Sequence, residues 1–356
     1  MIRDIFHNII VQRDLENIYK SEGIDWNRLR EKSVFLSGAY GMLASYMVYM
    51  LAYLKLKKQI DVDIVISGRS SEKAYQRFGS IMDAANILFF KWDVTSDISD
   101  NIPRCDYVIH AASPASGQSY STNPVGTLLA NIIGTKNTLE YARRSKTSSY
   151  LLFSSGEVYG RVESPFMGEK SYGSLDPTLV RNCYGEGKRA AECLCACWSK
   201  QYGMHVSYVR PSHTYGPTMD IDSDPRVFSS FVANALRGED IVMTSDGSAM
   251  RSFCYIADAT AAFFKVLLYG ENAEAYNVAC EKGQMSIADL AEMISRLSRN
   301  KVGIVRRERK EPYIENVVTL YPQQDVDKLS RLGYTCSTSP SEGFKRTLKS
   351  FELERI

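Results

Sequence analysis

The sequence predicts an α/β protein built on a doubly wound parallel sheet. From Ser33 onward, short apolar strands alternate with helical segments, and a glycine-containing turn joins the first strand to a very apolar helix. Several of the later strands end in small or polar residues. This alternation is typical of parallel sheets, whose ligands bind at the carboxyl edge of the strands. With 356 residues, of which 44% are apolar and 24% charged, the chain is long enough for a sizeable core.

Composition excludes several classes of protein. A formal net charge of +2 is too small to predict nucleic acid or an anionic membrane surface as a partner. The N-terminus mixes acidic and basic residues where a secretory signal needs an apolar core, so we expect a cytoplasmic protein. The apolar run Met42–Leu54 has about 13 residues against the ~20 that span a bilayer, which favours a buried helix.

The cysteines predict neither a disulfide scaffold nor a metal site. There are eight, without any C-x-x-C pair. Cys193, Cys195 and Cys197 alternate along a predicted helix, where i, i+2 neighbours point apart. We therefore expect them to be buried thiols in a reducing compartment.

The first strand, Ser33–Ser37, leads into a glycine loop. The spacing is Gly38-x-Tyr40-Gly41-Met42-x-Ala44, and such glycines let the backbone approach a pyrophosphate at the start of the next helix. We predict that Gly38, Tyr40, Gly41 and Met42 contact a dinucleotide. The alternative is a simple glycine turn.

The ends of the next strands predict the rest of the cofactor site. After the strand Asp61–Ser67, a dinucleotide fold often has an acid that binds the ribose and favours NAD. This chain has Arg69 instead, which makes NADP an alternative to NAD, although a solvated loop arginine is also consistent. Asp93 and Val94 follow the strand 87–92, and we expect them to contact adenine.

The strand 107–113 ends in Ala111, Ala112 and Ser113, small residues that allow the backbone to pass close to a cofactor. His110 in the same strand is predicted to be a packing residue rather than a catalyst. A further strand, 149–154, delivers Ser155, Gly156 and Glu157 to the carboxyl edge.

Tyr184 and Lys188 are the candidate catalytic pair. Four residues apart in a predicted helix, they lie on one face, about one turn apart. We expect the lysine charge to lower the pKa of the phenol from about 10, so that the tyrosine can remove a hydroxyl proton near neutral pH. A chance pair on a solvated helix face is the alternative.

Together these motifs resemble those of the extended short-chain dehydrogenases/reductases of the NAD-dependent epimerase/dehydratase family. Further similar segments occur in the same order, and they extend the resemblance to about Phe351. The additional segments are His213-Thr-Tyr-Gly-Pro217, Asp246-Gly-Ser-Ala-Met-Arg-Ser-Phe253, Tyr276-Asn-Val278 and Asp325-Val-Asp-Lys-Leu-Ser-Arg-Leu-Gly333. The resemblance implies a Rossmann-type domain at 33–210 and a smaller mixed α/β substrate-binding lobe, mainly 211–356, interleaved with it. Residues 1–32 are predicted to be a helical extension.

The resemblance also implies oxidation of a sugar C4 hydroxyl by bound NAD(P). Tyr184 would act as the base, Ser155 would bind the hydroxyl, and Lys188 would hold the nicotinamide ribose. Glu157 would act on or position the sugar. The implied substrate is a UDP- or dTDP-linked sugar and the implied assembly a homodimer that pairs helices near 126–145 and 184–202. The implied substrate-binding residues are Ser113, Ser155, Gly156, His213, Arg226, Val227 and Arg251.

Within the family, the pattern is most similar to that of the UDP-glucuronate decarboxylases. The chain departs from that pattern at Gly156, where decarboxylases usually have serine and dehydratases an acid, at His213, where asparagine is usual, and at Thr218, where arginine is usual. A 4-epimerase, 4-keto reductase or 4,6-dehydratase therefore stays open, as does a catalytically silent NAD(P)-binding sensor.

Overall fold

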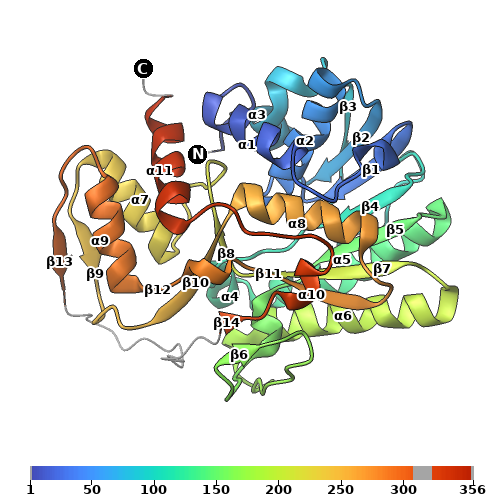
Figure 1. Ribbon diagram of the computed structural model, residues 1–356. Helices are drawn as coiled ribbons and strands as arrows, with labels where there is room; N and C mark the ends of the chain where they lie inside the picture. Colours follow the sequence, from blue (N-terminus) through green and yellow to red (C-terminus); the bar gives the residue numbers. More distant parts are fainter. Residues whose placement is uncertain (1, 308–322, 354–356) are drawn as a thin grey trace.

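The computed structural model describes residues 2–307 and 323–353, and its central element is a seven-stranded parallel sheet (Figure 1). The strand order is β11-β7-β5-β4-β1-β2-β3, so the chain moves outward from β1 in one direction and then from β4 in the other. This topology confirms the predicted doubly wound fold, and the switch between β1 and β4 is the place where sheets of this kind bind ligands. The strands are β1 (Lys32–Ser37), β2 (Val62–Gly68), β3 (Ile87–Lys91), β4 (Tyr107–His110), β5 (Ser149–Phe153), β7 (Val206–Pro211) and β11 (Glu274–Val278).

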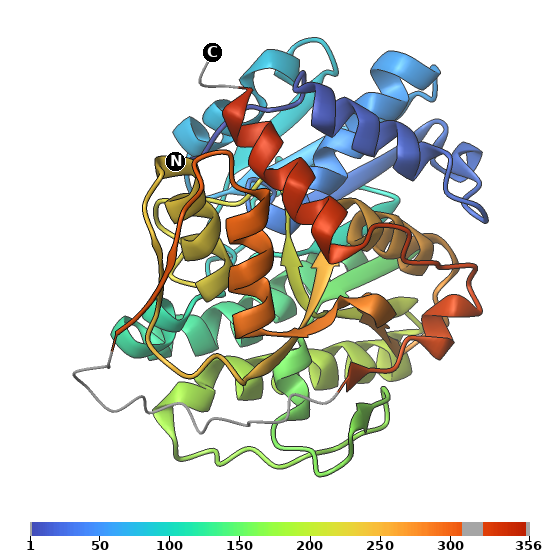
Figure 2. The same cartoon turned by 60° about the vertical axis from the view of Figure 1, so that its left-hand side comes forward.

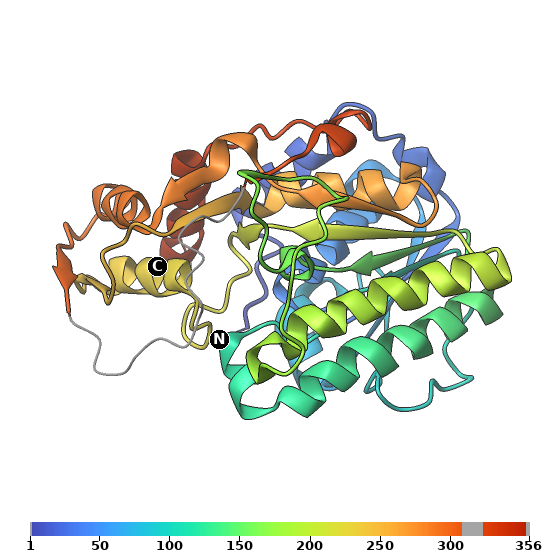
Figure 3. The same ribbon diagram turned by 90° about the horizontal axis from the view of Figure 1, so that it is seen from below.

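Helices cover both faces of this sheet. Figure 3 shows two long helices, α5 (Pro124–Ser145) and α6 (Cys183–Tyr202), side by side on one face. The other face is covered by α2 (Met42–Lys58), α3 (Ser71–Met82) and α8 (Ile256–Tyr269). In α2, every residue from Ala44 to Leu54 is buried, because this helix lies between the sheet and neighbouring helices. The prediction of a buried helix is thereby confirmed.

A smaller lobe follows Pro211 and contains a mixed three-stranded sheet. Its central strand, β10 (Met250–Tyr255), is parallel to β8 (His213–Tyr215) and antiparallel to β12 (Gln284–Ser286). Because α8 and β11 return to the main sheet, the two parts are interleaved. The domain boundaries expected after residues 32 and 210 stay a prediction. Residues 1, 308–322 and 354–356 lie outside the described residues. The lobe also has β9 (Ile241–Met243), β13 (Ile304–Arg306), α7 (Val227–Arg237), α9 (Ile287–Leu297), α10 (Asp327–Ser330) and α11 (Pro340–Glu352).

Short elements complete the fold around the carboxyl edge of the main sheet. A two-stranded pair, β6 (Phe166–Met167) and β14 (Gln323–Gln324), joins the segment after β5 to the returning chain. The helix α4 (Gly117–Thr122) precedes α5. The remaining turns are η1 (Trp26–Leu29), η2 (Gly156–Tyr159), η3 (Val180–Asn182) and η4 (Glu281–Gly283).

The N-terminal extension is part of the core. Its helix α1 (Ile9–Tyr19) packs against α2, α8 and α11, and Figure 2 shows α11 crossing beside it. Val11, Leu15 and Ile18 are buried in these contacts. The helical prediction for residues 1–32 therefore holds for α1 and η1, and burial of its apolar face explains why the helix forms.

Asp14 of α1 joins four elements in the interior. Its carboxylate accepts hydrogen bonds from the hydroxyls of Tyr46 in α2, at 2.7 Å, and Tyr255 in β10, at 2.6 Å. Arg346 of α11 donates to the same carboxylate at 3.2 Å. Burial raises the pKa of Asp14 to about 6, against the opposing effects of these three partners.

Two findings correct the predictions about cysteine. Cys195 is buried, but Cys193 and Cys197 are exposed, because the i, i+2 spacing turns them to the outer face of α6. In addition, Cys280 and Cys336 form a disulfide that the sequence analysis did not predict. This bond joins the end of β11 to the loop before α11.

In the part of the chain that the structure describes, every helix is too short or too polar to cross a membrane. The same residues contain no group of three or more His, Cys, Asp or Glu side chains placed to hold a metal ion.

The Asp14 cluster predicts a large and specific loss of stability. Asp14→Ala should lower the free energy of unfolding by about 3–5 kcal/mol, because two buried phenols and Arg346 lose their common acceptor. Asp14→Asn should cost less, since it keeps a carbonyl acceptor. Urea unfolding measures both. Asp63→Ala, at an exposed position, is the control, and its free energy of unfolding should change by no more than about 0.5 kcal/mol. If Asp14→Ala lowers the free energy of unfolding no more than this control does, the prediction is contradicted.

Candidate functional site

The parallel register gathers the strand ends at one edge of the sheet. Ser37 at the end of β1 is aligned with Ser67 of β2 and with His110 of β4. The hydroxyl of Ser37 lies 2.7 Å from Nδ1 of His110, which is buried. The pKa of His110 falls to about 3, first because of burial and then because of the Lys188 charge. His110 is thus a packed neutral residue, in agreement with its predicted role.

The glycine loop crosses directly over the end of β4. Gly38 has φ +68°, and a Cβ there would stand 2.6 Å from Cα of Ala112. Only glycine allows both this backbone conformation and this approach. The glycine loop therefore lies against the segment 111–113.

The start of α2 is suited to a phosphate group. Gly41 is its N-cap residue and is exposed, and no side chain caps the helix. The first N–H groups of a helix need acceptors, and an anion supplies them while interacting with the positive end of the helix dipole. These residues fit the diphosphate of a dinucleotide.

Tyr40 and Arg69 meet at the end of β2. The Tyr40 ring lies on Gly68, where a Cβ would stand 2.3 Å from its Cε1 atom, and its hydroxyl accepts a hydrogen bond from the Arg69 N–H at 3.1 Å. Asp93 is near the Arg69 charge. Hydrogen bonds from Thr95 are the first cause of its lowered pKa, and burial opposes them. The arginine charge is thus close to a carboxylate.

Val94 is placed by contacts from α5. A Cβ at Gly134 would stand 2.8 Å from Cγ2 of Val94, and Asn137 donates to the Val94 carbonyl oxygen at 2.9 Å. Ser113 donates to Oδ1 of Asn131, also on α5, at 2.8 Å. Asn131 was not among the predicted residues, because its contact with Ser113 depends on how α5 packs.

Tyr184 and Lys188 lie together inside the molecule. Both are buried, and Nζ of Lys188 is 5.7 Å from the centroid of the Tyr184 ring. The ammonium donates to the carbonyl oxygen of Phe153, at the end of β5, at 2.7 Å. The Ser155 side chain is close enough to the Tyr184 hydroxyl to oppose the rise in its pKa. The predicted pair thus lies on one helix face, and it is buried rather than solvated.

The predicted lowering of the Tyr184 pKa is wrong for this structure. Burial raises the pKa of Tyr184 to about 12, and the Glu157 charge raises it further, while Ser155 and two arginines oppose these effects. Burial also lowers the pKa of Lys188 to about 7, against the opposing charge of Glu192. Desolvation is the first cause of both pKa shifts, and the ammonium donates to the Phe153 carbonyl oxygen rather than to the phenol.

The turn η2 begins directly after Ser155 and includes Gly156 and Glu157. Ser155 is its N-cap residue and accepts a hydrogen bond from the Glu157 N–H at 3.2 Å. Oε1 of Glu157 is 3.3 Å from Nη2 of Arg181. Gly156 is buried and adds no functional group. The carboxylate of Glu157 is therefore held near Tyr184 by an arginine that the sequence analysis did not select.

A cationic cluster faces the site from the smaller lobe. His213 lies in β8, its backbone paired with Phe253 in β10, and the charges of Arg251 and Arg226 assist burial in lowering its pKa to about 3. Val227, which begins α7, is partly exposed. Arg226 and Arg251 are thus close enough to His213 for their charges to act on it, and the histidine is neutral.

Arg226 also connects the lobe to the glycine loop. It forms an ion pair with Asp224 at 2.6 Å and donates to Sδ of Met42 at 3.5 Å. Thr218 donates to the Met42 carbonyl oxygen at 3.0 Å. Thr218, where the decarboxylase pattern usually has arginine, therefore forms a contact between the smaller lobe and the glycine loop.

Two further sets of side chains lie beside the site, although no pattern in the sequence predicted them. Tyr120 of α4 stacks on Tyr184 with ring centroids 4.9 Å apart, and Arg181 lies 4.9 Å from the Tyr120 centroid. Glu192, one turn beyond Lys188, forms a buried ion pair with Arg210 at 2.5 Å. Both contacts join segments distant in sequence, so neither spacing nor composition predicted them.

Comparison with known proteins agrees with this geometry. The model of the NAD dependent epimerase/dehydratase family matches residues 34–279. The chain belongs to this family. It is therefore an enzyme of the NAD-dependent epimerase/dehydratase family, as the sequence resemblance implied.

Relatives within the family include decarboxylases. The chain is 34% identical over 271 residues to UDP-glucuronic acid decarboxylase 5 of Arabidopsis thaliana, covering 76% of each protein. Among solved structures, a UDP-glucose 4-epimerase of Thermotoga maritima with UDP-glucose gives a TM-score of 0.77 at 22% identity, covering 91% of this chain and 100% of that one. A dTDP-glucose 4,6-dehydratase of Streptomyces venezuelae with NAD bound gives 0.74 at 20% identity, covering 91% and 98%. Both solved structures share the fold of this protein.

The buried ammonium of Lys188 predicts how stability depends on pH. Its pKa is near 7 in the folded protein and near 10.5 in the unfolded chain, which therefore holds more protons between these values. The free energy of unfolding of the cofactor-free protein should rise with pH from about 7 to 10, relative to Lys188→Met, by up to about 1.4 kcal/mol per pH unit. Chemical denaturation at several pH values measures this difference, and a flat difference would contradict the burial effect.

Proposed function

We propose that this protein oxidises the C4 hydroxyl of a nucleotide-linked sugar, and that its reaction is the decarboxylation of UDP-glucuronate. The proposal is carried by the buried pair of Tyr184 and Lys188, with Ser155 and Glu157 close to the Tyr184 phenol. The 34% identity to plant UDP-glucuronic acid decarboxylases supports the choice of reaction. Gly156 supports it as well, because this position has no acid to protonate a C6 leaving group, as dehydration requires.

NAD is the cofactor that we propose. The exposed start of α2 would hold its diphosphate, Gly38 and the segment Ala111–Ser113 would border it, and Asp93 with Val94 would meet adenine. Lys188 would hold the nicotinamide ribose. Arg69 would favour NADP if its charge were available, but Asp93 partly balances it. Bound NAD supplies the hydride acceptor for oxidation at C4 and the hydride donor for the final reduction.

Tyr184 acts as the base and acid in this mechanism. Its hydroxyl, close to Ser155, would take the proton of the C4 hydroxyl, and bound NAD would accept the C4 hydride, so that C4 becomes a ketone. The C5 carboxylate is then a β-keto acid, and its C–C bond breaks to release CO2 with the electron pair held as an enolate. After water supplies a proton to C5 and hydride returns to C4, Tyr184 would give its proton back to the C4 oxygen.

The charged groups around the pair would orient the substrate. Arg226 and Arg251 come from the smaller lobe, and guanidinium groups bind the oxygens of a diphosphate well. His213 between them is neutral and can donate or accept a hydrogen bond. Glu157, paired with Arg181, would position the sugar, and Ser113 would border both cofactor and sugar.

We also propose a homodimer that pairs α5 and α6 with their copies. These helices lie side by side on one face of the sheet and carry exposed apolar side chains, among them Val125, Leu129 and Tyr202. A four-helix bundle would bury them. Sedimentation at micromolar concentration tests the dimer, and Leu129→Glu should shift it to monomer.

The role of Tyr184 can be tested by removing one oxygen atom. Tyr184→Phe should reduce turnover by about 10²–10⁴-fold because the base is lost, while bound cofactor is retained. Tyr172→Phe, at a highly exposed tyrosine, is the matched control and should leave turnover unchanged. Equal turnover in the Tyr184→Phe variant and the unmodified protein would rule out this mechanism.

The reaction and cofactor can be tested together. When the purified protein is denatured, mass spectrometry of the released nucleotide should identify NAD rather than NADP. Incubation with UDP-glucuronate, followed by NMR, should show UDP-xylose or its 4-keto form. Recovery of unchanged UDP-glucuronate, with conversion of another nucleotide sugar such as UDP-glucose, would replace the decarboxylase proposal by an epimerase or reductase.

A further inference from the structure

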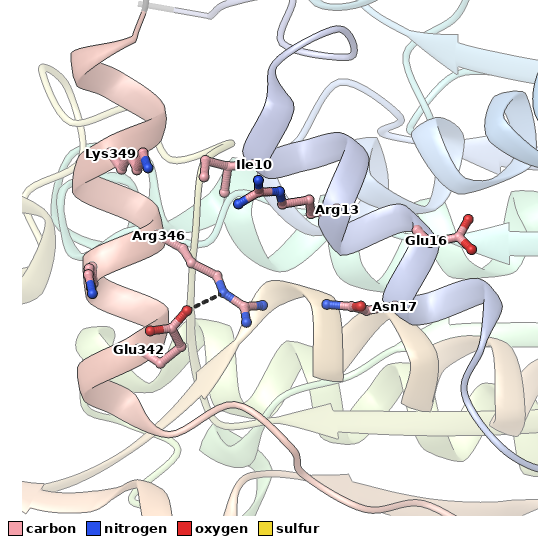
Figure 4. Close-up of a pocket in the computed structure, with 8 residues that line it drawn as sticks. Ile10, Arg13, Glu16, Asn17, Glu342, Arg346 and Lys349 are labelled. Carbon is pink, nitrogen blue, oxygen red and sulfur yellow. Dashed lines mark hydrogen bonds and ion pairs between the residues drawn. The ribbon is translucent and has the colours of Figure 1, made fainter.

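A groove between α1 and α11 lies outside the site described above. Its cavity has a volume of about 350 Å³, within the roughly 300–1,000 Å³ of small-molecule sites. Side chains of Arg13 and Glu16 line it from α1, and side chains of Glu342, Arg346 and Lys349 line it from α11 (Figure 4). All of these residues fall outside the segment 34–279 that the family model matches. The groove is therefore built by parts of the chain that the family model does not include.

Positive charge exceeds negative charge in this groove. With Lys345, its lining has four cations against two carboxylates. Glu16 is already paired with Lys20 at 3.0 Å and Lys58 at 2.7 Å, neither of which lines the groove. Among the described residues, Arg13, Lys345 and Lys349 have no ion-pair partner. An anion entering the groove would therefore meet uncompensated cations.

Arg346 is held in place at the inner wall of the groove. It donates to Glu342 at 2.8 Å and to the buried Asp14 at 3.2 Å. Figure 4 shows its guanidinium between the two helices, with Arg13 and Asn17 on the facing helix. A guanidinium fixed by two carboxylates loses little conformational freedom when it binds a third anion.

We propose that this groove binds a small phosphate-bearing metabolite. A phosphate monoester carries about −1.5 to −2 charges near pH 7, which matches the excess of positive charge. Arginine and lysine are the side chains that bind phosphate oxygens most effectively. The cavity is larger than a phosphate group needs, and Ile10 and Asn17 supply apolar and amide contacts for an organic part. This site is separate from the proposed function and does not depend on it.

The groove is connected to the functional site through Asp14. The Asp14 carboxylate binds Arg346 on one side and the hydroxyls of Tyr46 and Tyr255 on the other. Tyr46 belongs to the helix that follows the glycine loop, and Tyr255 belongs to the strand that carries Arg251. A ligand that bridges α1 and α11 would therefore stabilise the elements that support both halves of the site.

Calorimetric titration with inorganic pyrophosphate, without divalent metal, tests the proposal on the full chain. The double variant Arg13→Ala/Lys349→Ala should weaken binding by about tenfold or more, because two charge-assisted contacts are lost. The control Lys57→Ala/Lys200→Ala removes two exposed lysines away from the groove and should leave the affinity unchanged. Thermal unfolding without ligand checks that all variants remain folded.

Arg251→Ala separates this groove from the proposed diphosphate site. Retained pyrophosphate binding in Arg251→Ala, together with weakened binding in the groove variant, would support the proposal. Loss of all binding in Arg251→Ala with unchanged affinity in Arg13→Ala/Lys349→Ala would overturn it, because the probe would then occupy only the proposed diphosphate site. Absence of saturable binding to the unmodified protein, or equal weakening in the lysine control, would overturn it as well.

Discussion

The burial of Lys188 beside Tyr184 is the constraint on which the site depends. An ammonium group away from water needs acceptors, and the carbonyl oxygen of Phe153 at the end of β5 supplies one at 2.7 Å. On the same helix, Tyr184 lies close to Ser155, and Glu192, one turn beyond Lys188, pairs with Arg210. Desolvation brings the pKa of Lys188 to about 7, so that the charged and neutral forms are similarly populated at pH 7, and it keeps the phenol protonated. The pair therefore needs another positive or hydrogen-bonding group before the phenol can ionise.

The smaller lobe contacts the main sheet beside the glycine loop. The glycine loop belongs to the main sheet, yet the Met42 carbonyl oxygen accepts from Thr218, and Arg226 contacts the Met42 side chain. The smaller lobe thereby brings two arginines toward the carboxyl edge of the sheet. This arrangement places cationic groups opposite an exposed helix start, as an anionic nucleotide sugar and an anionic dinucleotide both require.

The N-terminal extension contributes to the core of the protein. Its buried apolar face packs on α2 and α8, and Asp14 inserts a carboxylate among two tyrosine hydroxyls and an arginine. A buried charge of this kind is costly unless all its partners are present, so the extension, α2, β10 and α11 depend on one another. The groove between α1 and α11 exists because of this mutual packing.

Much of the fold could be predicted from the sequence because its signals are local. The alternation of strands and helices, the glycine loop, the apolar α2 and the Tyr184/Lys188 spacing are properties of short segments, and backbone geometry turns them directly into structure. Only the tertiary structure decided the pKa values of Tyr184 and Lys188, the stacking of Tyr120, the exposure of Cys193 and Cys197, the disulfide between Cys280 and Cys336, and the role of Asp14. Each of these depends on which distant segments exclude water or approach one another, and the order of residues along the chain does not specify those contacts by itself.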